Sequence, residues 1–149
     1  MRRELVGGYE IDDDRDRIDV DVLFRFLSEE AYWTRGRSRE TIERLIREST
    51  RVIGVYRGDE QVGFARVMSD DANMAWLGDV FVLAEHRGRG LGAELVREAV
   101  EHPPQRDLTW FLNTRDAHSL YARFGFELPN ERTMVRLRGD QRPASSDAG

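Results

Sequence analysis

Arg87-Gly88-Arg89-Gly90-Leu91-Gly92 is the most informative segment of the sequence, because it sets three alternating glycines between an apolar run and an amphipathic segment. A helix N-terminus has unpaired backbone N–H groups and carries partial positive charge. Glycines let that backbone approach phosphate oxygens closely, and the guanidinium groups of Arg87 and Arg89 add fork-shaped donors. The stretch therefore predicts a strand–turn–helix unit whose turn binds a pyrophosphate. The alternative is a glycine turn that only caps the helix.

Two better-known phosphate motifs do not match this turn. A P-loop ends in Gly-Lys-Ser/Thr, and the sequence contains no lysine. The dinucleotide fingerprint needs Gly-x-Gly-x-x-Gly, whereas Gly88, Gly90 and Gly92 are each two residues apart. A nucleotide-binding regulatory domain that uses the turn for another phosphate stays open as an alternative.

Helical and strand patterns flank the turn on both sides. Apolar residues recur every three or four positions in some segments and alternate or run continuously in others. This order of elements predicts an α/β or α+β fold, with a sheet between helices. Helices are expected at about 19–32, from an N-cap at Ser38, at 90–102 and at 116–124, and strands at 9–11, 52–56, 61–68, 75–82, 108–113 and 133–137.

The composition fits one domain whose hydrophobic core is large enough to fold without disulfides or a bound metal. The chain has 149 residues, enough for a sizeable hydrophobic core. We expect a single domain over residues 1–138, and a disordered tail over residues 139–149 because that stretch is small and polar. The absence of cysteine excludes disulfides, thiolate metal sites and a cysteine nucleophile. The three histidines lack metal-ligand spacing, so we expect no metal.

Charge and hydropathy limit the partners. A net charge of −5 argues against a nucleic-acid footprint. No apolar run reaches the length of a membrane span, and the N-terminus lacks the apolar core of a signal peptide. We therefore expect a cytoplasmic protein that binds neither nucleic acid nor membrane.

Two motifs resemble those of one family. The stretch from Val82 to Gly92 resembles the signature of the GNAT superfamily of N-acetyltransferases, Arg/Gln-x-x-Gly-x-Gly/Ala after a strand. The stretch from Ala117 to Phe126 resembles the second motif of that family, a helix with Ala-x-x-x-Tyr that ends in Gly-Phe. The resemblance covers roughly residues 61–137. It implies a mixed, mostly antiparallel central sheet of about six or seven strands, flanked by about four helices.

The resemblance also implies a donor site for acetyl-CoA as cosubstrate. Backbone amides from Gly88 to Ala93 would hold the pyrophosphate of coenzyme A, and the strand before the turn would pair with the pantetheine arm. Thr114 stands where many members have asparagine. The donor-binding residues expected in this way are Val80, Phe81, Val82, Arg87, Gly88, Arg89, Gly90, Leu91, Gly92, Ala93, Thr114 and Tyr121.

Tyr121 matches the position of the general acid in the family. A phenol with a pKa of about 10 stays protonated at neutral pH and can protonate the departing thiolate. The alternative is a core tyrosine that anchors its helix. Asp79 lies in an apolar strand, where burial is expected to raise its pKa toward that of a useful base. It is the candidate base, with a structural hydrogen-bonding role as its alternative and His118 as the second candidate.

The resemblance places the acceptor against the first two helices and their connection. The candidate residues there are Tyr32, Trp33, Arg35 and Arg37. Aromatic rings can hold an ammonium group and arginines a carboxylate or phosphate; the alternative is a buried tryptophan and solvated arginines. The expected reaction is direct attack by a primary amine of a small molecule or peptide in a ternary complex. A non-catalytic acyl-CoA-binding module is the main alternative. The oligomeric state is left open, with a homodimer as one option.

Overall fold

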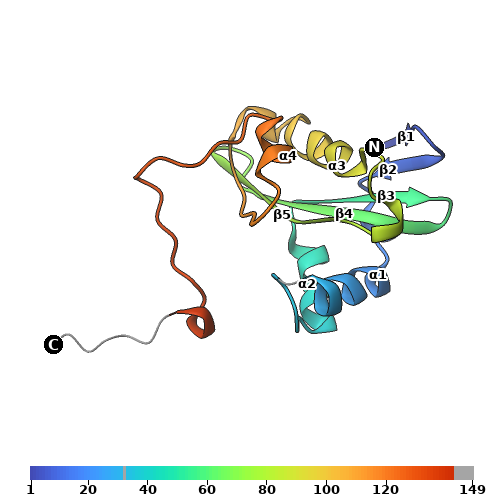
Figure 1. Cartoon of the computed structure of the whole chain (residues 1–149), viewed down its shortest axis with the longest axis horizontal. Coiled ribbons are helices and arrows are strands. Elements are labelled where there is room, and N and C mark those ends of the chain that lie inside the picture. The colour runs from blue at the N-terminus through green and yellow to red at the C-terminus, as the bar shows by residue number, and fades with distance from the viewer. Residues whose placement is uncertain (32, 143–149) are drawn as a thin grey trace.

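The computed structural model describes residues 1–31 and 33–142. A six-stranded sheet forms one layer, with α3 and α4 over one face and α1 and α2 over the other (Figure 1). The strands, in their order across the sheet, are β1 (Arg2–Leu5), β2 (Tyr9–Asp12), β3 (Arg51–Arg57), β4 (Glu60–Ser69), β5 (Met74–Val82) and β6 (Thr109–Phe111). The helices are α1 (Val20–Arg25), α2 (Arg39–Glu48), α3 (Leu91–Val100) and α4 (His118–Ala122).

Strand pairing is antiparallel from β1 to β5 and parallel between β5 and β6. The parallel step requires a crossover, and α3 supplies it across one face of the sheet. The mixed, mostly antiparallel sheet with four helices confirms the fold class expected from the sequence.

Each face of the sheet carries its own hydrophobic cluster. On one face, buried side chains of β2 to β5 pack against α3 and α4; on the other, Val52, Phe64 and Phe81 pack against α1 and α2. The sheet therefore separates two helical layers, and residues at its edge can be reached from either side.

The α1–α2 layer begins as the sequence predicts. Asp19 caps α1 by accepting the N–H groups of Asp21 and Val22. Ser38 is the predicted N-cap of α2, and its side chain accepts the N–H of Thr41. The α-helix ends at Arg25, however, and a π-helical turn, η2 (Phe26–Glu30), follows it. The predicted helix to residue 32 is therefore too long as an α-helix.

One strand near the N-terminus was not predicted, and one strand predicted near the C-terminus does not form. β1 pairs with β2 although its charged sequence gives no strand signal. Residues 133–137 alternate like a strand but form none, and Met134 and Val135 are 93% and 77% exposed. Alternating side chains do not by themselves make a strand, because its backbone N–H and C=O groups must also pair with a neighbouring strand. Residues 128–142, called here the C-terminal arm, instead extend away from the sheet and its helices (Figure 1).

The predicted tail begins inside the arm. Gly139–Gln141 form a short 3-10 turn, η5, and residues 143–149 lie outside the described part of the chain. Among the described helices, none is long and apolar enough to cross a membrane.

Candidate active site

The C-terminal half of β5 has an open edge. β5 pairs with β6 only from Met74 to Trp76, so among the described residues its later positions have no strand partner on that side. An open strand edge presents backbone donors and acceptors at regular spacing, which an extended ligand can pair with like an added strand. The sequence predicts this role for Val80, Phe81 and Val82.

A bulge at Asp79 decides which way these side chains point. Phe64 and Arg66 of β4 pair with Phe81 and Gly78, so β5 holds one extra residue between the two pairs. Asp79 has a φ of 53°, which is uncommon for a residue with a side chain. The extra residue shifts the alternation by one. Ala75 and Leu77 face α3, and beyond the bulge it is Val80 and Val82 that do so.

Phe81 is therefore turned to the other face of the sheet. It belongs to the cluster under α1 and stacks on Phe26, with ring centroids 4.1 Å apart and planes at 15°. If regular alternation continued through Asp79 with no bulge, Phe81 would share the α3 face with Leu77. The bulge therefore decides that Phe81 faces α1 while Val80 and Val82 face α3.

The glycine turn connects β5 to α3. A short 3-10 helix, η3 (Ala84–His86), follows the strand, and Gly88 and Gly90 both have φ of 78°. Glycine is required there by conformation rather than by space, since a Cβ on either residue would meet no atom within 4 Å. Gly90 is the N-cap of α3, and no side chain of the described residues caps that helix. Its first N–H groups are therefore open to an anion.

The two arginines of the turn make different contacts. Arg87 donates from Nε to the carbonyl oxygen of Val82 at 2.9 Å, which closes the turn on the end of β5. Arg89 lies over the ring of Tyr9, with 6.0 Å between the guanidinium carbon and the ring centroid. Both side chains remain exposed.

A pocket of about 400 Å³ joins the end of β5, the glycine turn and α4. Most of the predicted donor residues line it, whereas Arg89, Ala93 and Thr114 do not. The side-chain oxygen of Thr114 accepts the N–H of Ala117 at 3.0 Å just before α4, so it supports the helix. The lining residues are Val80, Phe81, Val82, His86, Arg87, Gly88, Gly90, Leu91, Gly92, Ala117, Leu120 and Tyr121.

Tyr121 is the phenol of this pocket. It is mostly buried, and its ring meets the ring of Phe126 edge-on at 5.9 Å. Burial raises the pKa of the Tyr121 phenol above its ordinary value, and the charge of Asp116 adds to the rise. The hydroxyl is therefore protonated at neutral pH, which is the state that a proton donor needs.

Asp79 is buried on the other side of β5 among three donors. Its carboxylate accepts hydrogen bonds from Arg66 Nε at 2.6 Å, Arg37 Nη1 at 2.8 Å and Trp33 Nε1 at 3.3 Å. Burial raises the pKa of this carboxyl, but the attraction and hydrogen bonds of the two arginines outweigh it, so the pKa lies below its ordinary value. The predicted rise of the Asp79 pKa is wrong, because the sequence pattern showed the apolar strand but not the arginines.

Residues 19–126 match the family model described as Acetyltransferase (GNAT) family. The chain belongs to the GNAT family of acetyltransferases. No curated protein matches it.

One of three similar solved structures supports the family assignment, and the other two share the fold. A structure assigned to the GNAT family from Xanthomonas campestris pv. campestris is 38% identical, with a TM-score of 0.83 over 87% of this chain and 93% of that one. A structure from Deinococcus radiodurans, described as an acetyltransferase, is 20% identical, with a TM-score of 0.69 over 91% and 94% of the two chains. Glucosamine-6-phosphate N-acetyltransferase from Arabidopsis thaliana is 13% identical, with a TM-score of 0.60 over 87% and 99%, and shares the fold.

The predicted acceptor residues of this GNAT protein are only partly brought together. Arg37 and Trp33 converge on Asp79, and Trp33 is 43% exposed with its ring edge-on to Phe26. Arg35 is exposed, and Tyr32 lies outside the described residues.

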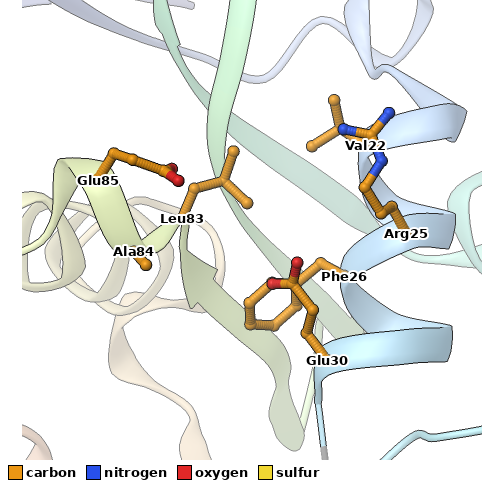
Figure 2. Close-up of a pocket in the computed structure, with 7 residues that line it drawn as sticks. All are labelled: Val22, Arg25, Phe26, Glu30, Leu83, Ala84 and Glu85. Atoms are coloured by element: carbon orange, nitrogen blue, oxygen red, sulfur yellow. The ribbon is translucent and has the colours of Figure 1, made fainter.

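A second pocket of about 150 Å³ opens on the α1 side of β5. Figure 2 shows charged side chains from α1, η2 and η3 around apolar ones at this pocket. Phe26 lines it and stacks on Phe81, which lines the donor pocket. The lining residues are Val22, Arg25, Phe26, Glu30, Leu83, Ala84 and Glu85.

Sequence reasoning missed three residues of the donor pocket: His86, Ala117 and Leu120. Ala117 and Leu120 are in the second family motif, and His86 directly precedes the glycine turn, so adjacency to the motifs was the available signal. Within residues 1–31 and 33–142, no group of three His, Cys, Asp or Glu side chains could hold a metal ion.

Proposed function

We propose that this protein is a cytoplasmic N-acetyltransferase that moves the acetyl group of acetyl-CoA to a primary amine of a small molecule or peptide. The observation that carries the proposal is the pocket of about 400 Å³ in which the open edge of β5, the uncapped N-terminus of α3 and Tyr121 meet. Each of these parts suits a different portion of an acyl-CoA.

The donor fits this pocket in extended form. The pyrophosphate accepts hydrogen bonds from the backbone N–H groups of residues 88–93, where helix polarity and glycine conformation favour an anion. Arg87 and Arg89 add positive charge at the same turn. The pantetheine arm pairs with the open edge at Val80–Val82, and this brings the thioester toward Tyr121.

Tyr121 is the proposed general acid. In direct attack the amine nitrogen bonds to the acetyl carbon, the bond from that carbon to sulfur breaks, and the thiolate takes up a proton. The protonated phenol of Tyr121, which lines the pocket, supplies that proton or a hydrogen bond. The chain has no cysteine, so a cysteinyl-acyl intermediate is excluded.

Asp79 receives a changed role in this proposal. Its pKa below the ordinary value makes it a weak base, and its carboxylate is already shared by Arg37, Arg66 and Trp33. We propose that Asp79 holds the connection between α1 and α2, called here the acceptor wall, against the sheet. We also propose that the acceptor amine loses its proton to water. His118 is exposed and does not line the donor pocket, so it is not favoured as the base.

The acceptor approaches from the α1–α2 side. Trp33 and Arg37 form the part of that wall that meets the bulge of β5, and Arg35 lies on the same exposed connection. An aromatic ring and guanidinium groups suit an acceptor that carries both an amine and an acidic group.

Calorimetric titration with acetyl-CoA and with ATP tests the donor. Binding of acetyl-CoA but not of ATP supports the proposal, and binding of ATP alone would replace it with the nucleotide-binding alternative. Release of free thiol from acetyl-CoA in the presence of a panel of primary amines then tests transfer. Tight donor binding without thiol release for any amine would favour the non-catalytic acyl-CoA-binding module.

A homodimer is also proposed. The C-terminal arm exposes four apolar side chains in the described structure, and such side chains are more stable when a partner covers them. They are Leu128, Met134, Val135 and Leu137.

A further inference from the structure

Tyr9 of β2 lies under the glycine turn. It is only 2% exposed and belongs to the core between the sheet and α3. Its hydroxyl is 2.8 Å from Nδ1 of His86, and the two rings are perpendicular with centroids 5.7 Å apart. A residue near the start of the chain thus contacts the last residue of η3, just before the turn.

The same ring contacts the turn a second time. The guanidinium carbon of Arg89 lies 6.0 Å from the ring centroid, and that of Arg57, from β3, lies 5.2 Å from it. Contacts of this kind are attractive because the ring face carries partial negative charge. Tyr9 therefore supports residues on both sides of Gly88, at His86 and at Arg89.

The hydrogen bond between Tyr9 and Nδ1 leaves Nε2 of His86 for a hydrogen bond to another group. The Tyr9 hydroxyl lies within hydrogen-bond distance of Nδ1, and the tautomer in which the hydroxyl donates carries its ring proton on Nε2. His86 is half-buried and lines the donor pocket beside Arg87 and Gly88. In the described part of the chain it belongs to no group of metal-ligating side chains. In this tautomer the Nε2–H is a donor beside the glycine turn.

We propose that His86 donates a hydrogen bond from Nε2 to a phosphate oxygen of the bound acyl-CoA, and that Tyr9 is the positioning residue that fixes the ring and its proton. This inference rests on the proposed function, since it assigns a further contact to the same donor. It extends the phosphate site beyond the backbone of the glycine turn to a side chain that a buried strand residue orients.

Titration calorimetry with acetyl-CoA tests the contact. We expect His86→Ala to weaken the binding of acetyl-CoA about tenfold, as the loss of a hydrogen bond to a charged group does. The same variant should bind acetyl-pantetheine, which has no diphosphate, as the unchanged protein does in an NMR titration. His102→Ala is the matched control, because His102 follows α3 outside the donor pocket, and should bind acetyl-CoA normally.

Tyr9→Phe tests the positioning role. It should weaken acetyl-CoA binding about threefold, since the His86 side chain stays but loses its orientation. Tyr56→Phe is the matched control on the neighbouring strand, because its buried hydroxyl has no hydrogen-bond partner in the described part of the chain. The imidazole nitrogen NMR signals of His86, assigned with His86→Ala, should show the proton on Nε2 in the unchanged protein and a mixture of tautomers in Tyr9→Phe.

Unchanged affinity for acetyl-CoA in His86→Ala would overturn the inference while leaving the proposed function intact. Equal weakening of acetyl-CoA and acetyl-pantetheine would also overturn it, because a general loss of pocket structure would then explain the effect. If the unchanged protein binds no acetyl-CoA at all, the proposed function fails, and the tautomer measurement still reports the Tyr9–His86 contact separately.

Discussion

At the scale of single residues, the carboxylate of Asp79 holds two layers together. It lies in the sheet and accepts hydrogen bonds from Trp33 and Arg37, which precede α2, and from Arg66 on β4. A buried carboxylate is stable in its charged form only when such partners are present. The connection between α1 and α2 is thereby fixed on the bulge, next to the place where the acetyl group is expected.

Asp79→Asn should lower both stability and acetyl transfer, because it leaves Arg37 and Arg66 without their shared anion. We expect a loss of about 3 kcal/mol in the free energy of unfolding at neutral pH, measured by urea denaturation. The folded-state pKa of Asp79 lies below its ordinary value of 3.8. Its ionised form therefore stabilises the fold above about pH 3.8, and the contribution is lost as the pH falls through the folded-state pKa.

The difference between the two proteins should accordingly shrink in acid. Asp59→Asn, in the exposed turn between β3 and β4, is the control and should leave stability unchanged. If Asp79→Asn instead shifts the acidic limb of the pH–rate profile without a loss of stability, Asp79 is the base after all.

Tyr121→Phe separates chemistry from binding. Removal of the proton donor should lower kcat about a hundredfold, while the affinity for acetyl-CoA should stay within about twofold because the ring still fills its site. Thiol-release kinetics and calorimetry measure the two quantities. An unchanged kcat would reject Tyr121 as the acid and leave it as a core residue.

Tyr56→Phe should stabilise the protein or leave it unchanged. The Tyr56 hydroxyl is buried and has no hydrogen-bond partner among residues 1–31 and 33–142, and such a group disfavours the folded state by about 1 kcal/mol or more. Urea denaturation measures the effect. A clear loss of stability would mean that the hydroxyl has a partner, such as an ordered water, in solution.

At the scale of elements, two glycines of the turn are required for different reasons. Gly90 has a φ of 78°, so Gly90→Ala should strain the turn by about 1 kcal/mol and weaken acetyl-CoA binding. Gly92 lies in α3 and its nearest neighbour to an added Cβ is Leu120 at 3.9 Å, so Gly92→Ala should fit the free protein. Its methyl group would point at the pocket that Gly92 lines, and should therefore weaken binding without a loss of stability.

Thermal unfolding and calorimetry on both variants distinguish the two effects. If Gly90→Ala melts at the same temperature as the unchanged protein, the left-handed conformation at Gly90 is not a requirement of the fold.

The sequence predicted the elements that are encoded locally. The strand–turn–helix at Gly88–Gly92 and the cap at Ser38 depend on residues within a few positions of each other, and both are confirmed. The partners of Asp79 and His86 could not be read in this way, because Arg37 is 42 positions from Asp79 and Tyr9 is 77 from His86. The strand predicted at residues 133–137 is wrong for the converse reason. Its side chains alternate locally, but it pairs with no other strand among the described residues.

At the scale of the whole molecule, the C-terminal arm makes the proposed homodimer testable. Met134 is 93% exposed on this arm. If a second copy covers the arm, Met134→Asp should shift the protein from dimer to monomer in analytical ultracentrifugation, because burying a charge is unfavourable. Arg132→Asp, nearby on the same arm, controls for charge alone. A monomer before any substitution would contradict the proposal.

The extra residue in β5 can be lost without changing which way the end of the strand faces. Because the bulge absorbs Asp79, a chain without that residue would pair Val80 with Ala65 and would keep Val80 and Val82 facing α3 and Phe81 facing α1. It would lose the carboxylate that Arg37 and Arg66 share. Relatives that lack the extra residue should therefore keep the alternation at the end of the strand and lack one or both of these arginines.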